Sequence, residues 1–164
     1  MRTEEEIFDL ILETAKADER IRAAYINGSR VNPNIEKDKY QDYDIVLLVT
    51  ETEPFLADKN WINIFGEIAF VQEPDSNDFG WGIEHDYTKS YGWLMLFTDG
   101  NRIDLHIMTK TAVLEEYLSD TLTVKLLDKD NILPEIPAAS DKGHLFSYSG
   151  TPSKLCWLYA AATF

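Results

Sequence analysis

The sequence lacks the features of a disulfide-stabilised or membrane-spanning protein. Its 164 residues include one cysteine, Cys156, which cannot form a disulfide within the chain and offers no spacing for a metal site. No apolar run approaches the roughly 18 residues that a membrane span needs. The opening residues, MRTEEEIFDL, are acidic where a signal peptide would be basic. These absences predict a cytoplasmic protein in a reducing compartment, with no membrane partner.

Positive charge is also scarce. The chain has 15 Lys and Arg residues against 29 Asp and Glu residues, a formal net charge of -14. Such a surface repels phosphate backbones, so no nucleic-acid partner is expected. It would attract a polycationic small molecule, although an acidic surface can also serve solubility alone. The charge therefore excludes one class of partner and leaves two interpretations open.

The remaining composition is typical of one folded domain. Hydrophobic residues make up 45% of the chain and aromatic residues 12%, enough to bury a core at this length. No internal repeat and no low-complexity tract interrupts the sequence. We therefore expect a single globular unit over most of the chain.

The hydrophobic pattern predicts an α+β domain. A capping box of Thr3 and Glu6 precedes apolar residues at helical spacing and predicts a helix from residue 4 to about 18. The dipeptide Asp99-Gly100 predicts a tight turn between strands 91–97 and 102–108. The other expected elements are strands at 23–27, 43–49, 67–72 and 122–127, a helical turn at 59–65, a loop at 75–90 and a helix at 111–118. This order predicts a mixed β-sheet with helices packed on one face.

Two aspartates stand at the start of the most apolar strand. The run Ile45 to Val49 predicts a strand buried on both faces and central in its sheet. Residues two apart on a strand share a face, so the carboxylates of Asp42 and Asp44 would lie side by side and raise each other's pKa. A hard divalent cation would relieve that repulsion. The alternative is that the pair only caps the strand and faces water.

A third carboxylate favours the metal site. The strand 102–108 alternates strictly, with Arg102, Asp104 and His106 on one face and apolar residues on the other. Three carboxylates on neighbouring strands can hold two magnesium ions roughly 4 Å apart, as in phosphoryl transfer. Asp42, Asp44 and Asp104 are therefore the predicted metal ligands.

A glycine-serine turn before these aspartates favours a nucleotide. Gly28 lets the backbone approach a phosphate without a Cβ in the way, and Ser29 can donate its hydroxyl and its N–H to the same group. Arg30 could offset phosphate charge, and a surface salt bridge is the alternative for it. Together these residues predict a nucleotide site.

The spacing of these residues resembles known enzymes. Gly28-Ser29, Asp42-x-Asp44 and Asp104 resemble the motif set of the DNA polymerase beta-like nucleotidyltransferase superfamily. Longer phrases resemble the aminoglycoside (streptomycin) 6-adenylyltransferases, namely Gly28-Ser29-Arg30-Val31-Asn32, Gln41-Asp42-Tyr43-Asp44-Ile45, Phe65-Gly66, Leu94-Met95-Leu96-Phe97 and Ile103-Asp104-Leu105. The resemblance runs from Met1 to about Asp141.

The resemblance implies a nucleotidyltransferase fold and a reaction. The reaction is magnesium-dependent transfer of AMP from ATP to a hydroxyl of an aminoglycoside such as streptomycin, a form of antibiotic resistance. The resemblance implies that Gly28 and Ser29 hold the triphosphate, where Arg30 could add its charge, and that Asp42 and Asp44 bind the metals. It implies that Asp104 ligates a metal, acts as the general base on the acceptor hydroxyl, or does both. Two alternatives stay open: another hydroxyl acceptor, such as a lincosamide or a protein side chain, and an inactive nucleotide-binding remnant.

The resemblance also implies a domain division. Residues 1–141 correspond to the catalytic domain, and residues 142–164 form a divergent tail where the family has a helical C-terminal domain that helps to enclose the aminoglycoside. We therefore expect a truncated catalytic domain, with reduced activity as one outcome.

Overall fold

A six-stranded mixed sheet forms the centre of the computed structural model, which describes residues 1–78, 80 and 82–140. The elements in chain order are α1 (Glu4–Ala17), β1 (Ile21–Asn27), the 3-10 turn η1 (Ser29–Val31), β2 (Tyr43–Val49), α2 (Glu53–Ala57), the 3-10 turn η2 (Trp61–Phe65), β3 (Ile68–Gln72), α3 (Pro74–Asp78), β4 (Ser90–Phe97), β5 (Arg102–Thr109), α4 (Lys110–Glu116) and β6 (Thr123–Asp128). The α+β class and the mixed sheet are confirmed.

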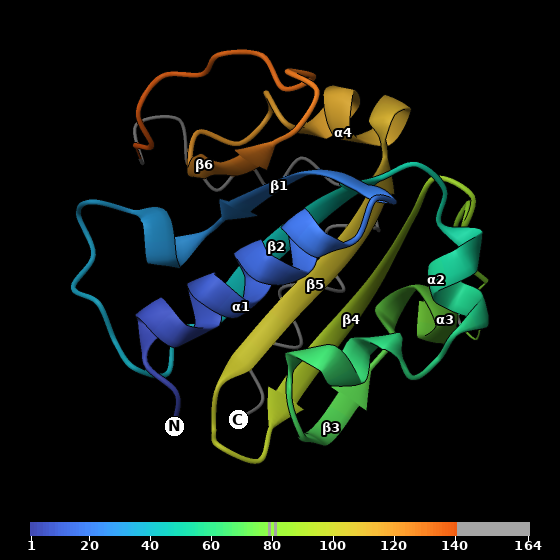
Figure 1. The fold of residues 1–164 in the computed structure, drawn as a ribbon, viewed down its shortest axis with the longest axis horizontal. Helices are drawn as coiled ribbons and strands as arrows, with labels where there is room; N and C mark the ends of the chain where they lie inside the picture. The colour runs from blue at the N-terminus through green and yellow to red at the C-terminus, as the bar shows by residue number, and fades with distance from the viewer. Residues whose placement is uncertain (79, 81, 141–164) are drawn as a thin grey trace.

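The strand order places β2 well inside the sheet. The order is β3-β4-β5-β2-β1-β6, and β2 pairs antiparallel with β1 and parallel with β5. Ile45 to Val49 are all buried, because both faces of this strand are covered. The prediction of a buried, central strand is confirmed, and Figure 1 shows β2 and β5 running together through the middle of the molecule.

Helices cover both faces of the sheet. In Figure 1, α1 lies across one face, where it buries Ile7 and Ile11 against Ile45 and Leu47. On the opposite face α4 packs Val113 into a second cluster formed with alternate strand residues. The prediction that helices pack on one face was therefore wrong for α4. The central strands are apolar on both sides, so each side needs a cover.

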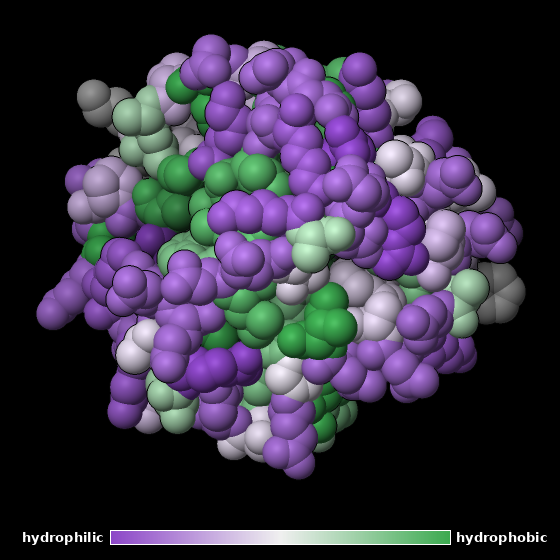
Figure 2. Space-filling view, viewed as in Figure 1, coloured by the Kyte–Doolittle hydropathy of each residue, from purple (hydrophilic) through white to green (hydrophobic). Residues whose placement is uncertain are grey.

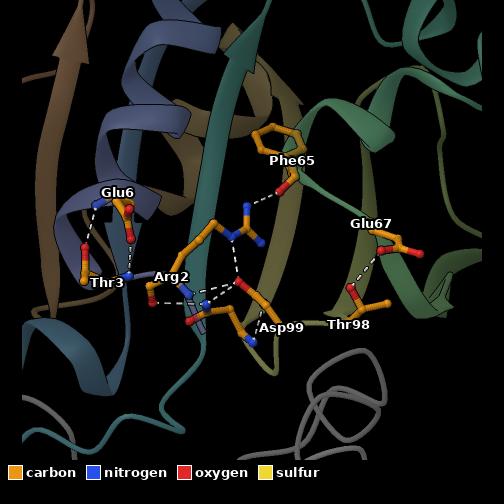
Figure 3. Close-up of polar contacts among 8 residues, drawn as sticks. Arg2, Thr3, Glu6, Phe65, Glu67, Thr98 and Asp99 are labelled. Atoms are coloured by element: carbon orange, nitrogen blue, oxygen red, sulfur yellow. Dashed lines mark hydrogen bonds and ion pairs between the residues drawn. The ribbon is translucent and has the colours of Figure 1, made fainter.

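The predicted capping box and hairpin both form (Figure 3). The side chain of Thr3 accepts a hydrogen bond from the Glu6 N–H, and the Glu6 carboxylate accepts one from the Thr3 N–H. At the β4–β5 turn, Arg2 donates to Asp99 Oδ2 at 2.7 Å and to the Phe65 carbonyl at 2.5 Å. The N-terminal segment thus holds the hairpin that leads into β5.

Two short helices were not predicted. Pro54 lies at the first turn of α2. Pro74 opens α3, whose remaining residues fall in the predicted loop 75–90. Proline fits the first turn of a helix because its missing N–H has no partner there in any case. Both prolines therefore mark the start of a short helix in the structure.

The outer surface on the α1 side is mainly hydrophilic. Figure 2 shows this side with hydrophilic residues in purple and a few hydrophobic areas in green, in line with 27% charged residues. None of the helices in the described part of the chain is long and apolar enough to cross a membrane. The predicted tail, residues 142–164, lies outside the described residues, so the domain boundary stays a prediction.

Candidate active site

Three carboxylates meet where β2 and β5 begin. The parallel register pairs Asp44 directly with Asp104, and Asp42 lies just before β2. One ligand oxygen from each carboxylate lies within 4.8 Å of the others. Asp44 shares its strand face with Val46, and Asp104 shares its face with Met108, both in the α4-side cluster. The predicted metal ligands are therefore brought together on the face opposite α1.

The crowding of these carboxylates changes their acidity. Burial, together with the charges of Asp42 and Asp104, raises the pKa of Asp44 to about 8. Burial also raises the pKa of Asp104 to about 6, against the lowering effect of Arg102. Both shifts arise mainly from burial, and neighbouring carboxylates add to them, so the ionised cluster would be stabilised by positive charge. His106 lies two residues after Asp104 on the same strand face. It does not provide a positive charge, because burial lowers the pKa of its imidazole to about 4.

Arg102 provides a positive charge beside this cluster. Its Nε lies 2.7 Å from Asp104 Oδ1 and its Nη2 lies 2.7 Å from Asp104 Oδ2, a bidentate pair. The same Nε lies 4.0 Å from Asp42 Oδ2. The alternating pattern predicted only that Arg102 shares a strand face with Asp104. The signal for its role was present, because residues 102 and 104 are two apart on one strand and so lie side by side.

Gly28 is packed against the cluster. It follows β1 with φ +82°, and a Cβ added there would lie 2.2 Å from Asp44 Oδ2. Its N–H donates to the Leu122 carbonyl at 3.1 Å, and Ser29 follows as the first residue of η1. The glycine is thus required by the Asp44 carboxylate itself. The predicted triphosphate role of Gly28 and Ser29 stays a prediction.

Arg30 is buried and bound to protein groups. Its Nε donates to the Asp42 carbonyl at 3.1 Å, and another nitrogen donates to the Gln41 carbonyl. Its Nη1 pairs with Glu4 at 2.9 Å, and the guanidinium lies 3.7 Å from the centre of the Tyr43 ring. These contacts fix the backbone that carries Asp42, which makes Arg30 a positioning residue. Its predicted contact with the triphosphate stays a prediction.

Removing the Arg30 guanidinium should destabilise the protein. We expect Arg30→Met to lower the free energy of unfolding by about 2 kcal/mol, because it leaves two backbone carbonyls without their donor. The matched control is Lys37→Met, since Lys37 also pairs with Glu4 but its side chain is 62% exposed, and such pairs contribute about 0.5 kcal/mol. Urea unfolding measures both variants. Equal losses would show that Arg30 does not anchor this segment.

Known proteins resemble this chain over most of its length. The sequence model of a family described as streptomycin adenylyltransferase matches residues 1–154. An aminoglycoside 6-adenylyltransferase from Campylobacter jejuni is 40% identical over 141 residues, which are 86% of this chain and 48% of that protein. One from Staphylococcus aureus is 34% identical over 146 residues, or 88% of this chain and 50% of that protein.

A solved structure is similar as well. The crystal structure of an aminoglycoside 6-adenyltransferase from Bacillus subtilis aligns with a TM-score of 0.62 and 29% sequence identity. The alignment covers 83% of this chain and 44% of that one. The chain thus spans about half the length of the curated relatives it matches.

Proposed function

Because the chain belongs to the streptomycin adenylyltransferase family, we propose that it takes part in magnesium-dependent transfer of AMP from ATP to a hydroxyl of an aminoglycoside such as streptomycin. The observation that carries this proposal is the cluster of Asp42, Asp44 and Asp104 on paired strands, with Gly28 packed against it. A cytoplasmic location, where ATP is available, stays a prediction.

The carboxylate cluster suits magnesium. All three side chains offer oxygen ligands, which hard divalent cations prefer, and the raised pKa values of Asp44 and Asp104 reflect a place that favours added positive charge. Asp42, Asp44 and Asp104 would hold the metal. When bound, magnesium would offset the negative charge of the phosphates during the transfer.

Asp104 fits the part of a general base. Its carboxylate lies in the cluster where the nucleotide and the acceptor would meet, and a general base must lie within hydrogen-bond reach of the proton that it accepts. The acceptor hydroxyl would lose its proton to Asp104 as its oxygen attacks the α-phosphorus of ATP. The bond from that phosphorus to the bridging oxygen then breaks, and pyrophosphate leaves. Gly28 and Ser29 would lie along the triphosphate.

The acceptor proposal has electrostatic support. The net charge of -14 attracts cationic ligands over distances near the Debye length, about 8 Å at physiological salt. An aminoglycoside carries several positive charges at neutral pH. A cationic acceptor therefore suits this surface better than an anionic one.

Pyrophosphate release tests the proposal. With ATP and magnesium, we expect release that depends on streptomycin, and we expect Asp104→Asn to slow it by about 100-fold through loss of the base. Asp9→Asn is the matched control, because Asp9 is an exposed residue of α1 on the other side of the sheet. Release with a lincosamide in place of streptomycin would identify another acceptor. Stabilisation by ATP and magnesium without any release would identify a nucleotide-binding protein only.

A further inference from the structure

Arg102 binds the Asp104 carboxylate, which is one of the predicted ligands of the proposed metal. Both oxygens of Asp104 accept hydrogen bonds from Arg102 at 2.7 Å, and the Asp104 side chain is only 7% exposed. The guanidinium also lies 4.0 Å from Asp42. One cation of the chain therefore stands between two of the three carboxylates of the cluster.

We propose that Arg102 is an internal counter-ion that competes with the divalent cation for Asp104 and releases this carboxylate when the metal binds. This inference rests on the metal site of the proposed function. A guanidinium and a divalent cation on the same carboxylate repel each other strongly, because both would sit a few ångströms apart beside a partly buried group. The two cations therefore exchange on Asp104.

The position of Arg102 allows that exchange. It is the first residue of β5, directly after the β4–β5 turn, and its side chain is 28% exposed. A long side chain at such a place can turn its guanidinium into water without moving the strand. Asp104 has no such freedom, because its side chain is buried and its strand, β5, is paired with β2 on one side and β4 on the other. The exchange thus moves the arginine and leaves the ligand in place.

The proposal predicts opposite effects of losing Arg102 on the stability of the metal-free protein and on its affinity for the metal. Without metal, Arg102 offsets the repulsion among Asp42, Asp44 and Asp104, so its loss should destabilise the protein. With metal, the same offset comes from the bound cation, and the loss of Arg102 removes a competitor. A variant without the guanidinium should therefore be less stable when metal-free and should bind metal more tightly.

Binding of Mn²⁺ to the full chain tests this inference. Titration calorimetry in the absence of nucleotide should give Arg102→Gln a dissociation constant for Mn²⁺ about tenfold lower than that of the unmodified protein, since one opposing charge is gone. Its melting temperature should fall by several degrees in EDTA and should rise more on adding Mn²⁺. Arg22→Gln is the matched control. It makes the same change in net charge, but Arg22 pairs with Asp130 and Glu19.

Each outcome decides between distinct conclusions. Unchanged or weaker binding of Mn²⁺ by Arg102→Gln would overturn the inference, because Arg102 would then hold Asp104 ready for the metal. Absence of binding to both proteins would overturn the metal site itself, and the magnesium part of the proposed function with it. If Arg102→Gln does not fold, Arg102→Lys decides the matter. The ammonium of lysine cannot bind both Asp104 oxygens as the planar guanidinium does. Tighter binding of Mn²⁺ by Arg102→Lys than by the unmodified protein would support the competition, and equal or weaker binding would refute it.

Discussion

Asp44→Asn is expected to stabilise the metal-free protein at pH 8. The pKa of Asp44 is about 8 in the folded protein against an ordinary 3.8. Between these two values the folded chain binds a proton that the unfolded chain has lost, so the free energy of unfolding falls as pH rises across this window. Asparagine cannot ionise and avoids that loss. We expect a gain of about 2 kcal/mol or more at pH 8 and little change near pH 4.

The same substitution should abolish adenylyl transfer. Loss of a metal ligand removes several kcal/mol of transition-state stabilisation, which corresponds to roughly a 1000-fold lower rate. Urea unfolding in EDTA at pH 4 and pH 8, together with pyrophosphate release, measures both effects. Asp9→Asn should change neither. Magnesium-dependent ATP binding and turnover equal to those of the unmodified protein would show that Asp44 is not a metal ligand.

Gly28→Ala is expected to damage both the fold and the site. The new Cβ would meet Asp44 Oδ2 at 2.2 Å. The backbone has φ +82° and ψ -158°, a region that essentially only glycine adopts, where a residue with a Cβ is strained by about 1–3 kcal/mol. Asp44 would have to leave its place beside Asp104. We expect a stability loss of about 3 kcal/mol, from the strain and the displaced carboxylate together, and loss of Mn²⁺ binding.

Gly82→Ala separates these two causes. Gly82 has a similar φ of +77°, but a Cβ added there meets nothing within 4 Å. This control therefore carries the strain of a positive φ without the contact to Asp44, and we expect it to keep Mn²⁺ binding and to lose about 1 kcal/mol. Equal stability losses and equal metal affinities in the two variants would show that the contact with Asp44 has no effect.

The sequence predicts the parts of the site that depend on local pattern. Alternation along residues 102–108 and the two-residue spacing of Asp42 and Asp44 are short-range properties. They correctly place Asp104 beside Arg102 and Asp42 beside Asp44. The buried run after Asp44 likewise predicts a central strand. These features need no knowledge of which strand lies beside which.

The features that were missed depend on tertiary contacts. No local signal shows that Arg30 reaches back to Glu4 in α1, or that α4 covers the second face of the sheet. The pairing of Arg102 with Asp104 is local, but its significance depends on Asp42 and Asp44 being near, which follows from the parallel register of β2 and β5. Such long-range register has no signature in a single sequence.

That parallel register also constrains the order of folding events. β2 and β5 lie far apart in the chain, with β3 and β4 between them, so their pairing must close a long loop before it gains any contact. While the strands are apart, Asp44 and Asp104 are hydrated and do not repel each other. The electrostatic conflict arises only when the two strands dock. The cation that resolves it, whether arginine or metal, therefore acts when β2 and β5 pair, and not before. This is also the step that joins Ile45 and Leu47 to Ile103 and Leu105 in the hydrophobic core.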